Sequence, residues 1–246
     1  MKTLYTNCVL VLILVLGMTR AYGGDNASNP LAAVNNTDFR LRYSNNLANI
    51  GDVNDFFVDG SYLLSQKFKI KYELHYLESD LTGSSEKDWE SFRLMFIYFA
   101  TQGMSGTWRY KLAFGTQLIV DFNNTSKGIG SGSDQFAPFI GMAFVKGKTV
   151  LIPLMQHFLS YSGPDVNTTA IRLIVIQSLP KQFWGKLDVT APIDWQNDNI
   201  VPASAEVQIG KTLSPKFGIY GDVLRIGIGD NKPYDWGAGI GMRFSY

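Results

Sequence analysis

The last thirteen residues, Tyr-Asp-Trp-Gly-Ala-Gly-Ile-Gly-Met-Arg-Phe-Ser-Tyr at positions 234–246, alternate between two kinds of side chain. Apolar and aromatic residues hold the even positions, namely Tyr234, Trp236, Ala238, Ile240, Met242, Phe244 and Tyr246. The odd positions hold Asp235, Arg243, Ser245 and the glycines 237, 239 and 241. Successive side chains of a strand point to opposite faces, so the stretch predicts a strand with one apolar face. The glycine face predicts open space beside it.

The same period of two recurs along the chain. It is clearest over residues 68–76, 108–122 and 183–193. Weaker segments fall at 37–43, 56–64, 90–101, 134–145, 149–160, 166–178, 202–212 and 216–226. The total is about twelve strands. Several are longer than the five or six residues usual in globular proteins, as membrane-spanning strands are.

The connections between these segments alternate in length. Short ones are expected at 65–66, 103–105, 146–148, 180–182 and 213–215, and longer polar ones at 44–55, 78–88, 123–132, 161–165, 194–200 and 227–233. Short turns at one end and longer loops at the other are typical of bacterial outer-membrane barrels. The sequence therefore predicts an all-β fold, a transmembrane antiparallel up-and-down β-barrel of about twelve strands. A soluble β-sandwich is the alternative, and aromatic residues near the strand ends argue against it.

The N-terminus predicts export to the bacterial outer membrane. Residues 1–23 have Lys2, an apolar core and a small-x-small site, which indicate a cleaved signal peptide. Residues 24–36 are expected to be a periplasmic leader, and 37–246 the barrel. Cys8, the only cysteine, lies in the signal segment, so no disulfide is expected. A net charge of +1 gives no reason to expect a nucleic-acid partner.

The sequence does not indicate an enzyme, a cofactor or a metal site. His157 has leucine at position 159 and serine only at 160, so a His–Ser pair on one strand face is not expected. An outer-membrane lipid-modifying enzyme stays a remote alternative. Histidines and carboxylates do not cluster at metal-ligand spacing.

The polar faces of the strands predict the lining of the barrel lumen. The expected lumen-lining residues are Lys69, Lys71, Glu73, His75, Arg93, Arg109, Lys111, Arg172, Lys186, Asp188, Glu206 and Arg243, with Asp121 and Asp235 as further acids. Basic residues exceed acidic ones, which favours a small pore that prefers anions. The alternative is a barrel closed by charge pairs, a non-conducting structural barrel that presents its outer loops to partners. Expected partners are outer-membrane lipid, a small solute and the barrel-assembly machinery.

The C-terminal half also resembles a known family. Asp165-Val166-Asn167 opens a strand, a turn with Pro180 precedes Trp184, the strand at 202–210 carries Glu206, and Tyr234-Asp235-Trp236 leads into the last strand. From about residue 133 onward these features resemble bacterial outer-membrane barrels associated with the meta-cleavage pathway of phenol degradation. The resemblance implies transport of small molecules, hydrophobic or aromatic ones among them. It assigns no site residues.

Overall fold

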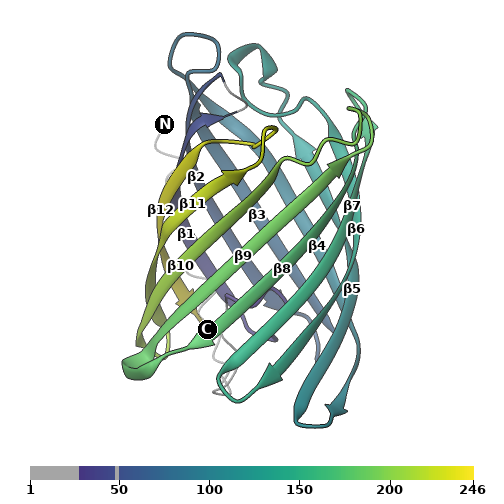
Figure 1. Cartoon of the computed structure of the whole chain (residues 1–246), viewed down its shortest axis with the longest axis vertical. Helices are drawn as coiled ribbons and strands as arrows, with labels where there is room; N and C mark the ends of the chain where they lie inside the picture. Colours follow the sequence, from purple (N-terminus) through teal and green to yellow (C-terminus); the bar gives the residue numbers. More distant parts are fainter. Residues whose placement is uncertain (1–27, 48–49) are drawn as a thin grey trace, which may run out of the picture.

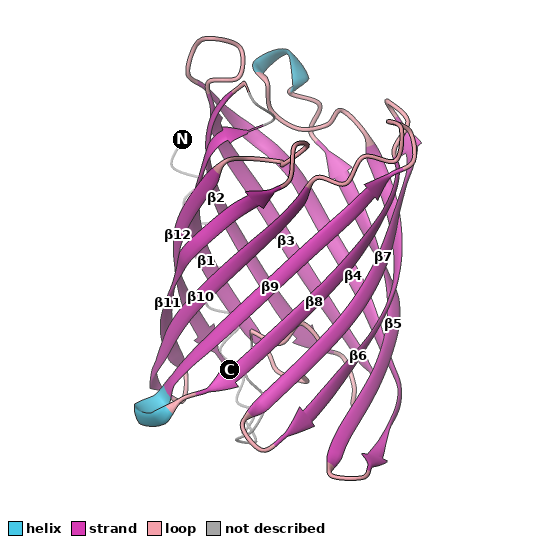
Figure 2. Cartoon of the chain, viewed as in Figure 1, coloured by secondary structure: helices cyan, strands magenta, loops and turns pink. Residues whose placement is uncertain are grey.

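The computed structural model describes residues 28–47 and 50–246, and the predicted signal peptide lies outside them. The described residues form twelve β-strands and two short 3-10 turns (Figure 1; Figure 2). The strands are β1 (Asn36–Leu47), β2 (Gly51–Leu63), β3 (Phe68–Ser79), β4 (Glu86–Ser105), β5 (Trp108–Asp121), β6 (Asp134–Lys146), β7 (Thr149–Ser162), β8 (Asn167–Ser178), β9 (Phe183–Asp194), β10 (Ala203–Ser214), β11 (Phe217–Ile228) and β12 (Trp236–Ser245). The turns are η1 (Thr125–Lys127) and η2 (Pro180–Gln182).

The sheet closes on itself. Each strand pairs antiparallel with the next, and β1 pairs with β12 from Asn36↔Ser245 to Ser44↔Gly237. A closed sheet leaves no strand edge with unpaired backbone groups, which is what a lipid environment requires. The predicted twelve-stranded up-and-down barrel is therefore confirmed. In the part of the chain that the structure describes, no helix is long and apolar enough to cross a membrane.

The two ends of the barrel differ. Five turns of two to four residues, at 64–67, 106–107, 147–148, 179–182 and 215–216, lie at the end that also holds the C-terminus, which we call the short-turn end. At the opposite end, the loop end, four connections are longer, at 80–85, 122–133, 195–202 and 229–235, whereas those at 48–50 and 163–166 are as short as the turns. One predicted long loop, over 44–55, is wrong. Strand β1 runs to Leu47 and β2 begins at Gly51, because Asp52 accepts a hydrogen bond from the Asn46 backbone N–H (2.9 Å) and extends the hairpin.

The outer face of the barrel is apolar. Large side chains that point outward stay exposed on every side, as with Leu41 (48% exposed), Ile171 (54%) and Ile240 (64%). Soluble monomers rarely leave a continuous apolar band of this extent open to water. The band is what the lipid-facing wall of a membrane barrel presents.

The closing strand keeps its predicted register with one exception. Trp236, Ile240 and Met242 face outward, whereas Tyr234 is buried before β12 begins, with its ring 4.9 Å from the Arg225 guanidinium. The prediction that Tyr234 shares the apolar face is wrong. The strand begins two residues later, since the chain at Tyr234 is still in the β11–β12 loop.

The space expected beside the inward-facing glycines of β12 is filled. A Cβ atom added at Gly241 would lie 2.3 Å from Cζ of Tyr220, and one at Gly239 would lie 2.6 Å from a carboxylate oxygen of Asp222. Both neighbours belong to β11 and point into the barrel. Glycine therefore makes room for polar side chains of the lumen wall rather than for an open passage.

Candidate functional site

The lumen wall has two parts with different chemistry. Ion-paired side chains line the strands from β8 through β12 and β1 to β4, and we call this part the charged arc. It contains the bases Arg40, Arg42, Lys71, Arg93, Arg172, Lys186, Arg225 and Arg243, the acids Asp38, Asp55, Asp59, Glu73, Glu90, Asp188, Glu206 and Asp222, and His75. Apolar side chains line β4 to β8, and we call that part the apolar arc.

Asp38 organises the charged arc where the sheet closes. Its fully buried carboxylate receives an Arg243 Nη2 hydrogen bond (2.6 Å), the Tyr220 hydroxyl hydrogen bond (2.7 Å) and an ion pair with Arg40 (3.3 Å). Arg40 also pairs with Asp59 of β2, with its Nε 2.8 Å from a carboxylate oxygen. Buried charges are tolerated only when paired, so the strands at the closure share one network.

A second branch of the network runs from β1 toward β8. Arg42 donates from Nε to Asp222 (2.8 Å) and pairs with Glu206 (3.0 Å). Glu206 also lies 3.6 Å from Nζ of Lys186, which pairs with Asp188 at 2.9 Å. Arg172 of β8 then donates from Nε to Asp188 (2.7 Å), which ends this branch.

A third branch occupies β2 to β4. His75 Nδ1 lies 3.0 Å from Asp55 of β2, and its Nε2 lies 3.5 Å from Glu73. Glu73 also faces Lys71 (3.8 Å) and Arg93 of β4 (3.9 Å). The longer distances and partial exposure of these groups mark the loosest part of the charged arc.

The ion pairs follow the wall of the barrel. The widest link within the described residues is Arg42 of β1 to Glu206 of β10, three strands away around the sheet. The other described pairs join groups in one strand or loop, or groups up to two strands apart. The ion pairs with contacts of 4 Å or less therefore run along the wall, between groups up to three strands apart.

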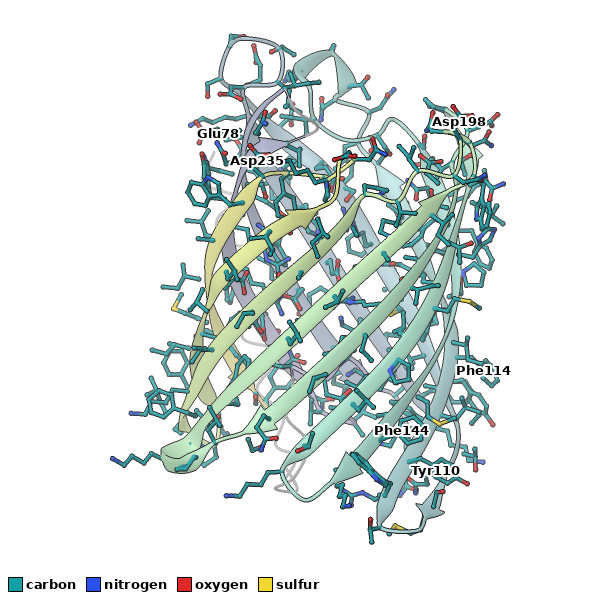
Figure 3. The ribbon with its side chains drawn as sticks, in the orientation of Figure 1. Glu78, Tyr110, Phe114, Phe144, Asp198 and Asp235 are labelled. Atoms are coloured by element: carbon teal, nitrogen blue, oxygen red, sulfur yellow. The ribbon has the colours of Figure 1, made fainter. Side chains whose placement is uncertain are left out.

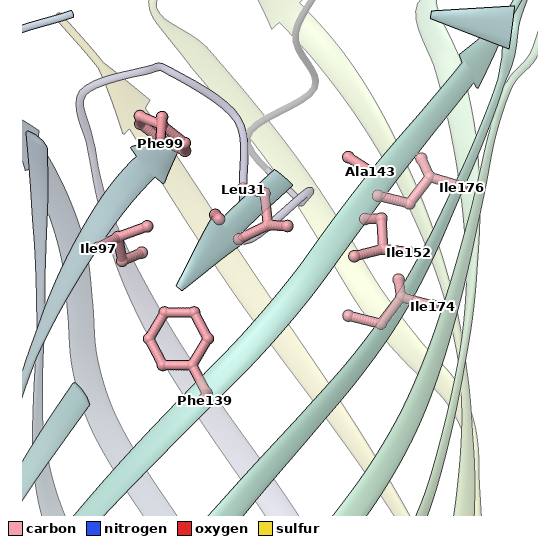
Figure 4. Close-up of a cluster of buried hydrophobic side chains, with 9 residues drawn as sticks. Leu31, Ile97, Phe99, Phe139, Ala143, Ile152, Ile174 and Ile176 are labelled. Carbon is pink, nitrogen blue, oxygen red and sulfur yellow. The ribbon is translucent and has the colours of Figure 1, made fainter. Parts of the chain in front are cut away.

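The apolar arc is covered by a segment that precedes the barrel. Leu31 is 1% exposed and packs against Ile97, Phe139, Ile152 and their neighbours (Figure 4). The cluster also contains Phe99, Ala113, Ala143, Ile174 and Ile176. Gly141 of β6 lies under Leu31, because a Cβ atom added there would be 3.4 Å from Leu31 Cδ1. Residues 28–35 thus lie inside the barrel at its short-turn end, in the range expected as a leader.

Polar contacts hold segment 28–35 in this position. Lys69 Nζ donates to the carbonyl oxygens of Pro30 (3.3 Å) and Ala32 (2.7 Å). Arg243 Nη1 donates to the Ser28 hydroxyl (2.9 Å), and the Ser61 hydroxyl donates to the Val34 carbonyl (2.8 Å). The segment is therefore joined to both arcs.

A cavity of about 600 Å³ opens beside this segment. Its lining combines apolar and basic side chains, and includes Ala33, Leu63, Phe99, Lys67 and Lys111. The Lys111 ammonium lies 4.9 Å from the centre of the Phe99 ring. Neutral polar residues such as Gln66 and Gln102 complete the lining, so the short-turn mouth combines positive charge with polar and apolar surface.

The residues predicted to line the lumen fall into three groups. Lys71, Glu73, His75, Arg93, Arg172, Lys186, Asp188, Glu206 and Arg243 lie in the charged arc. Lys69 and Lys111 lie at the short-turn mouth, next to segment 28–35 and the cavity. Arg109 is exposed at the start of β5, away from the charged arc.

Two further acids assigned to the lumen lie at the loop end, Asp121 as the last residue of β5 and Asp235 in the β11–β12 loop. Asp121 accepts hydrogen bonds from the backbone of Asn123 and Ser131, and Asp235 pairs with Lys232 at 2.8 Å. The hydrogen bond from Lys232 lowers the pKa of the Asp235 carboxyl below its usual value. Both carboxylates order loop structure. Asp121 nevertheless follows the buried Gln117 and Ile119 on the inward face of β5, whereas Asp235 lies in the β11–β12 loop, so the assignment of Asp235 to the lumen wall is wrong.

Eight members of the charged arc were not predicted from the sequence. They are Asp38, Arg40, Arg42, Asp55, Asp59, Glu90, Asp222 and Arg225. In β1 the signal is present, because Asp38, Arg40 and Arg42 alternate with apolar residues. In β11 a bulge between Asp222 and Arg225 leaves Val223 and Leu224 both exposed, and this shift returns Arg225 to the lumen.

His157 faces outward on β7. Its Nδ1 lies 2.9 Å from the Thr169 hydroxyl of β8, which also accepts a hydrogen bond from the Trp195 indole (2.9 Å). The Ser160 hydroxyl instead accepts from the Val166 backbone N–H (2.9 Å). Among the described contacts of His157 there is thus no serine to act as a nucleophile.

These observations define a class, a twelve-stranded membrane-type β-barrel with a polar lumen. Comparison with solved structures finds the same fold in the NanC porin, at 9% identity and a TM-score of 0.63, with 85% of this chain and 100% of that chain covered. The KdgM porin matches at 8% identity and a TM-score of 0.60, covering 86% and 99%. An outer membrane channel from Pseudomonas putida F1 matches at 10% identity and a TM-score of 0.60, covering 93% and 100%.

An enzyme also has this fold. Outer membrane phospholipase A from Escherichia coli matches at 10% identity and a TM-score of 0.53, covering 85% of this chain and 92% of that chain. No family model and no curated protein matches the sequence. At these identities the likeness shows the fold alone, so function has to be argued from the lumen.

Proposed function

We propose that the protein is an outer-membrane channel for small solutes, with a preference for anions. The observation that carries this proposal is the course of the direct ion pairs, which follow the wall between groups up to three strands apart. A twelve-stranded barrel has an interior between those of the filled eight-stranded barrels and the open porins. The shared fold with two porins and an outer membrane channel supports the same function.

The anion preference comes from the short-turn mouth. The charged arc contains eight bases and eight acids, so its formal charges balance apart from His75. Lys69 and Lys111 add positive charge next to segment 28–35, and Lys67 lines the adjoining cavity. Basic side chains along a solute path favour anions.

The apolar arc favours solutes that also have an apolar part. If segment 28–35 moves, Ile152, Ile174 and Phe139 are uncovered opposite the arginines of the charged arc. An aromatic carboxylate would contact both walls at once. The resemblance of residues 133–246 to barrels associated with aromatic degradation supports this solute class.

The test is the reversal potential of the purified chain in a planar bilayer with a KCl gradient. Wild type should conduct and select chloride over potassium. The Lys69→Gln, Lys111→Gln double variant should lose most of that selectivity, whereas Lys87→Gln at the loop end should keep it. Clear cation selectivity in wild type would contradict the proposed preference.

A second candidate is a non-conducting barrel that presents its loops to partners. The burial of Leu31 in the apolar arc favours it, because the segment fills part of the short-turn mouth. The two candidates differ in one outcome. Absence of conductance both in wild type and in a Leu31→Ala variant would support the non-conducting barrel.

A further inference from the structure

Basic side chains surround the short-turn end of the barrel. We call this set the basic collar, which comprises Lys67, Arg109, Lys146, Lys148, Lys181, Lys211 and Lys216. Each lies in one of the five short turns or within four residues of it, and six of the seven are exposed. No aspartate or glutamate lies within four residues of any of these turns. The five short turns and the residues within four positions of them therefore carry side-chain charge of one sign only, and the C-terminal carboxylate is the negative group that adjoins them.

The loop end has the opposite charge. Within two residues of the loops, the acids are Asp52, Glu78, Asp80, Glu86, Asp121, Asp134, Asp165, Asp194, Asp198, Asp230 and Asp235, against the bases Lys87, Lys127 and Lys232. Eleven acids against three bases leave about eight negative charges. Figure 3 shows Glu78, Asp198 and Asp235 at this end, with Tyr110 and Phe144 toward the other. A net charge of +1 for the whole chain conceals this division.

The collar is combined with aromatic rings on the outer face. Lys211 Nζ lies 4.9 Å from the centre of the Phe183 ring, and Lys146 Nζ lies 5.6 Å from that of Trp108. Phe183 is exposed on the outer wall of β9. Aromatic rings at the edge of the hydrocarbon, with ammonium groups beyond them, match the headgroup level of a bilayer.

We propose that the basic collar binds the anionic headgroups of the phospholipid leaflet at the short-turn end, and so selects phosphatidylglycerol over zwitterionic lipid. The inference rests on the proposed membrane location. Lysines near an anionic surface attract it, and the attraction is screened by salt. The acidic loop end repels the same headgroups, so the two ends of the barrel are matched to different surfaces.

The test measures lipid retained by the folded full chain in detergent, by native mass spectrometry, after addition of phosphatidylglycerol or phosphatidylcholine. Wild type should retain phosphatidylglycerol in preference. The collar variant Lys148→Gln, Lys181→Gln, Lys216→Gln removes one lysine from each of three turns. It should reduce the preference by about tenfold to a hundredfold, since each of the three lysines is worth up to about fivefold. Salt should weaken the wild-type preference as well.

The matched control is Lys87→Gln, Lys127→Gln, Lys232→Gln, which removes the same number of charges at the loop end. It should keep the wild-type preference, and a heat-modifiable gel shift confirms that each variant is folded. Equal retention of the two lipids by wild type, or equal loss in both triple variants, would overturn the proposal. Displacement of the lipid by inorganic phosphate at millimolar concentration would also overturn it, because a free-anion site would then explain the result.

This outcome is separate from that of the channel proposal. A chain that retains phosphatidylglycerol but never conducts contradicts the channel alone. A chain that conducts without any lipid preference contradicts the collar alone.

Discussion

The charged arc and the apolar arc lie on one continuous sheet, yet their side chains are satisfied in different ways. Asp38, Arg40 and Arg243 find their partners within the wall. Ile152, Ile174 and Phe139 instead need Leu31 from outside the wall to complete their packing. The side chains of the charged arc therefore need no partner from outside the strands. Those of the apolar arc would be open to the lumen if no other segment packed on them. Segment 28–35 covers them in this structure.

The largest expected effect concerns the charged arc. Asp38→Asn leaves Arg243 and Arg40 buried without this carboxylate, so the free energy of unfolding should fall by about 3–5 kcal/mol. Urea unfolding in detergent micelles measures the loss. Asp165→Asn in the β7–β8 loop is the control and should stay within about 0.5 kcal/mol of wild type. Equal stability of Asp38→Asn and wild type would mean that the network is not needed to close the sheet.

The apolar arc should respond to lost volume rather than lost charge. Ile174→Ala removes a fully buried side chain and should lower the free energy of unfolding by about 2–4 kcal/mol. Ile171→Ala on the outer face of the same strand is the control. Its loss should be under about 1 kcal/mol, since lipid or detergent refills the space. A comparable loss at both positions would show that the apolar arc is no better packed than the outer wall.

The packing of Leu31 on the apolar arc should affect conductance if the proposed channel passes this wall. Leu31→Ala removes most of the apolar contact of segment 28–35. The free energy that holds the segment in the barrel should fall by about 1.4 kcal/mol or more. Open channels should therefore become about tenfold more frequent. Single-channel recording at fixed voltage measures the open fraction. Leu41→Ala on the outer face of β1 should leave it unchanged. An open fraction that is the same in Leu31→Ala and wild type would separate the segment from gating.

The smallest expected effect is the difference between two anions, benzoate and acetate, in the concentration that blocks the channel. Benzoate can contact both arcs, whereas acetate has almost no apolar surface, so benzoate should reduce the chloride current at about tenfold lower concentration. Titration of the open-channel current in the Leu31→Ala variant measures both values. Equal concentrations for half block would argue against an amphipathic solute.

The sequence predicted the fold closely because period two is a local property. Residues 68–76 and 183–193 became β3 and β9 almost without change, and the closing strand differs only at its ends. The charged arc was only partly predictable. The bulge at Val223 and Leu224 breaks the period, so Arg225 could not be assigned to the lumen by counting.

Other features depend on tertiary structure. Pro30-Leu31-Ala32 carries no periodic signal, and nothing local says that it lies inside the barrel. The glycines of β12 predicted space, but Tyr220 and Asp222 from β11 fill it. The basic excess expected in the lumen is absent from the charged arc, because the members that were not predicted comprise five acids and only three bases. What remains of it lies at the short-turn mouth.

The most direct test of the account is the accessibility of single cysteines to a membrane-impermeant thiol reagent in proteoliposomes, with Cys8 replaced by serine. Thr190→Cys lies on the lumen face of β9, between Arg172 and Ser204 in the sheet. It should react readily, whereas Val189→Cys on the lipid side should not. Ala143→Cys in the apolar arc should react slowly in wild type and about tenfold faster with Leu31→Ala. Unreactive Thr190→Cys, or equal reaction at positions 189 and 190, would contradict a water-filled lumen with one covered wall.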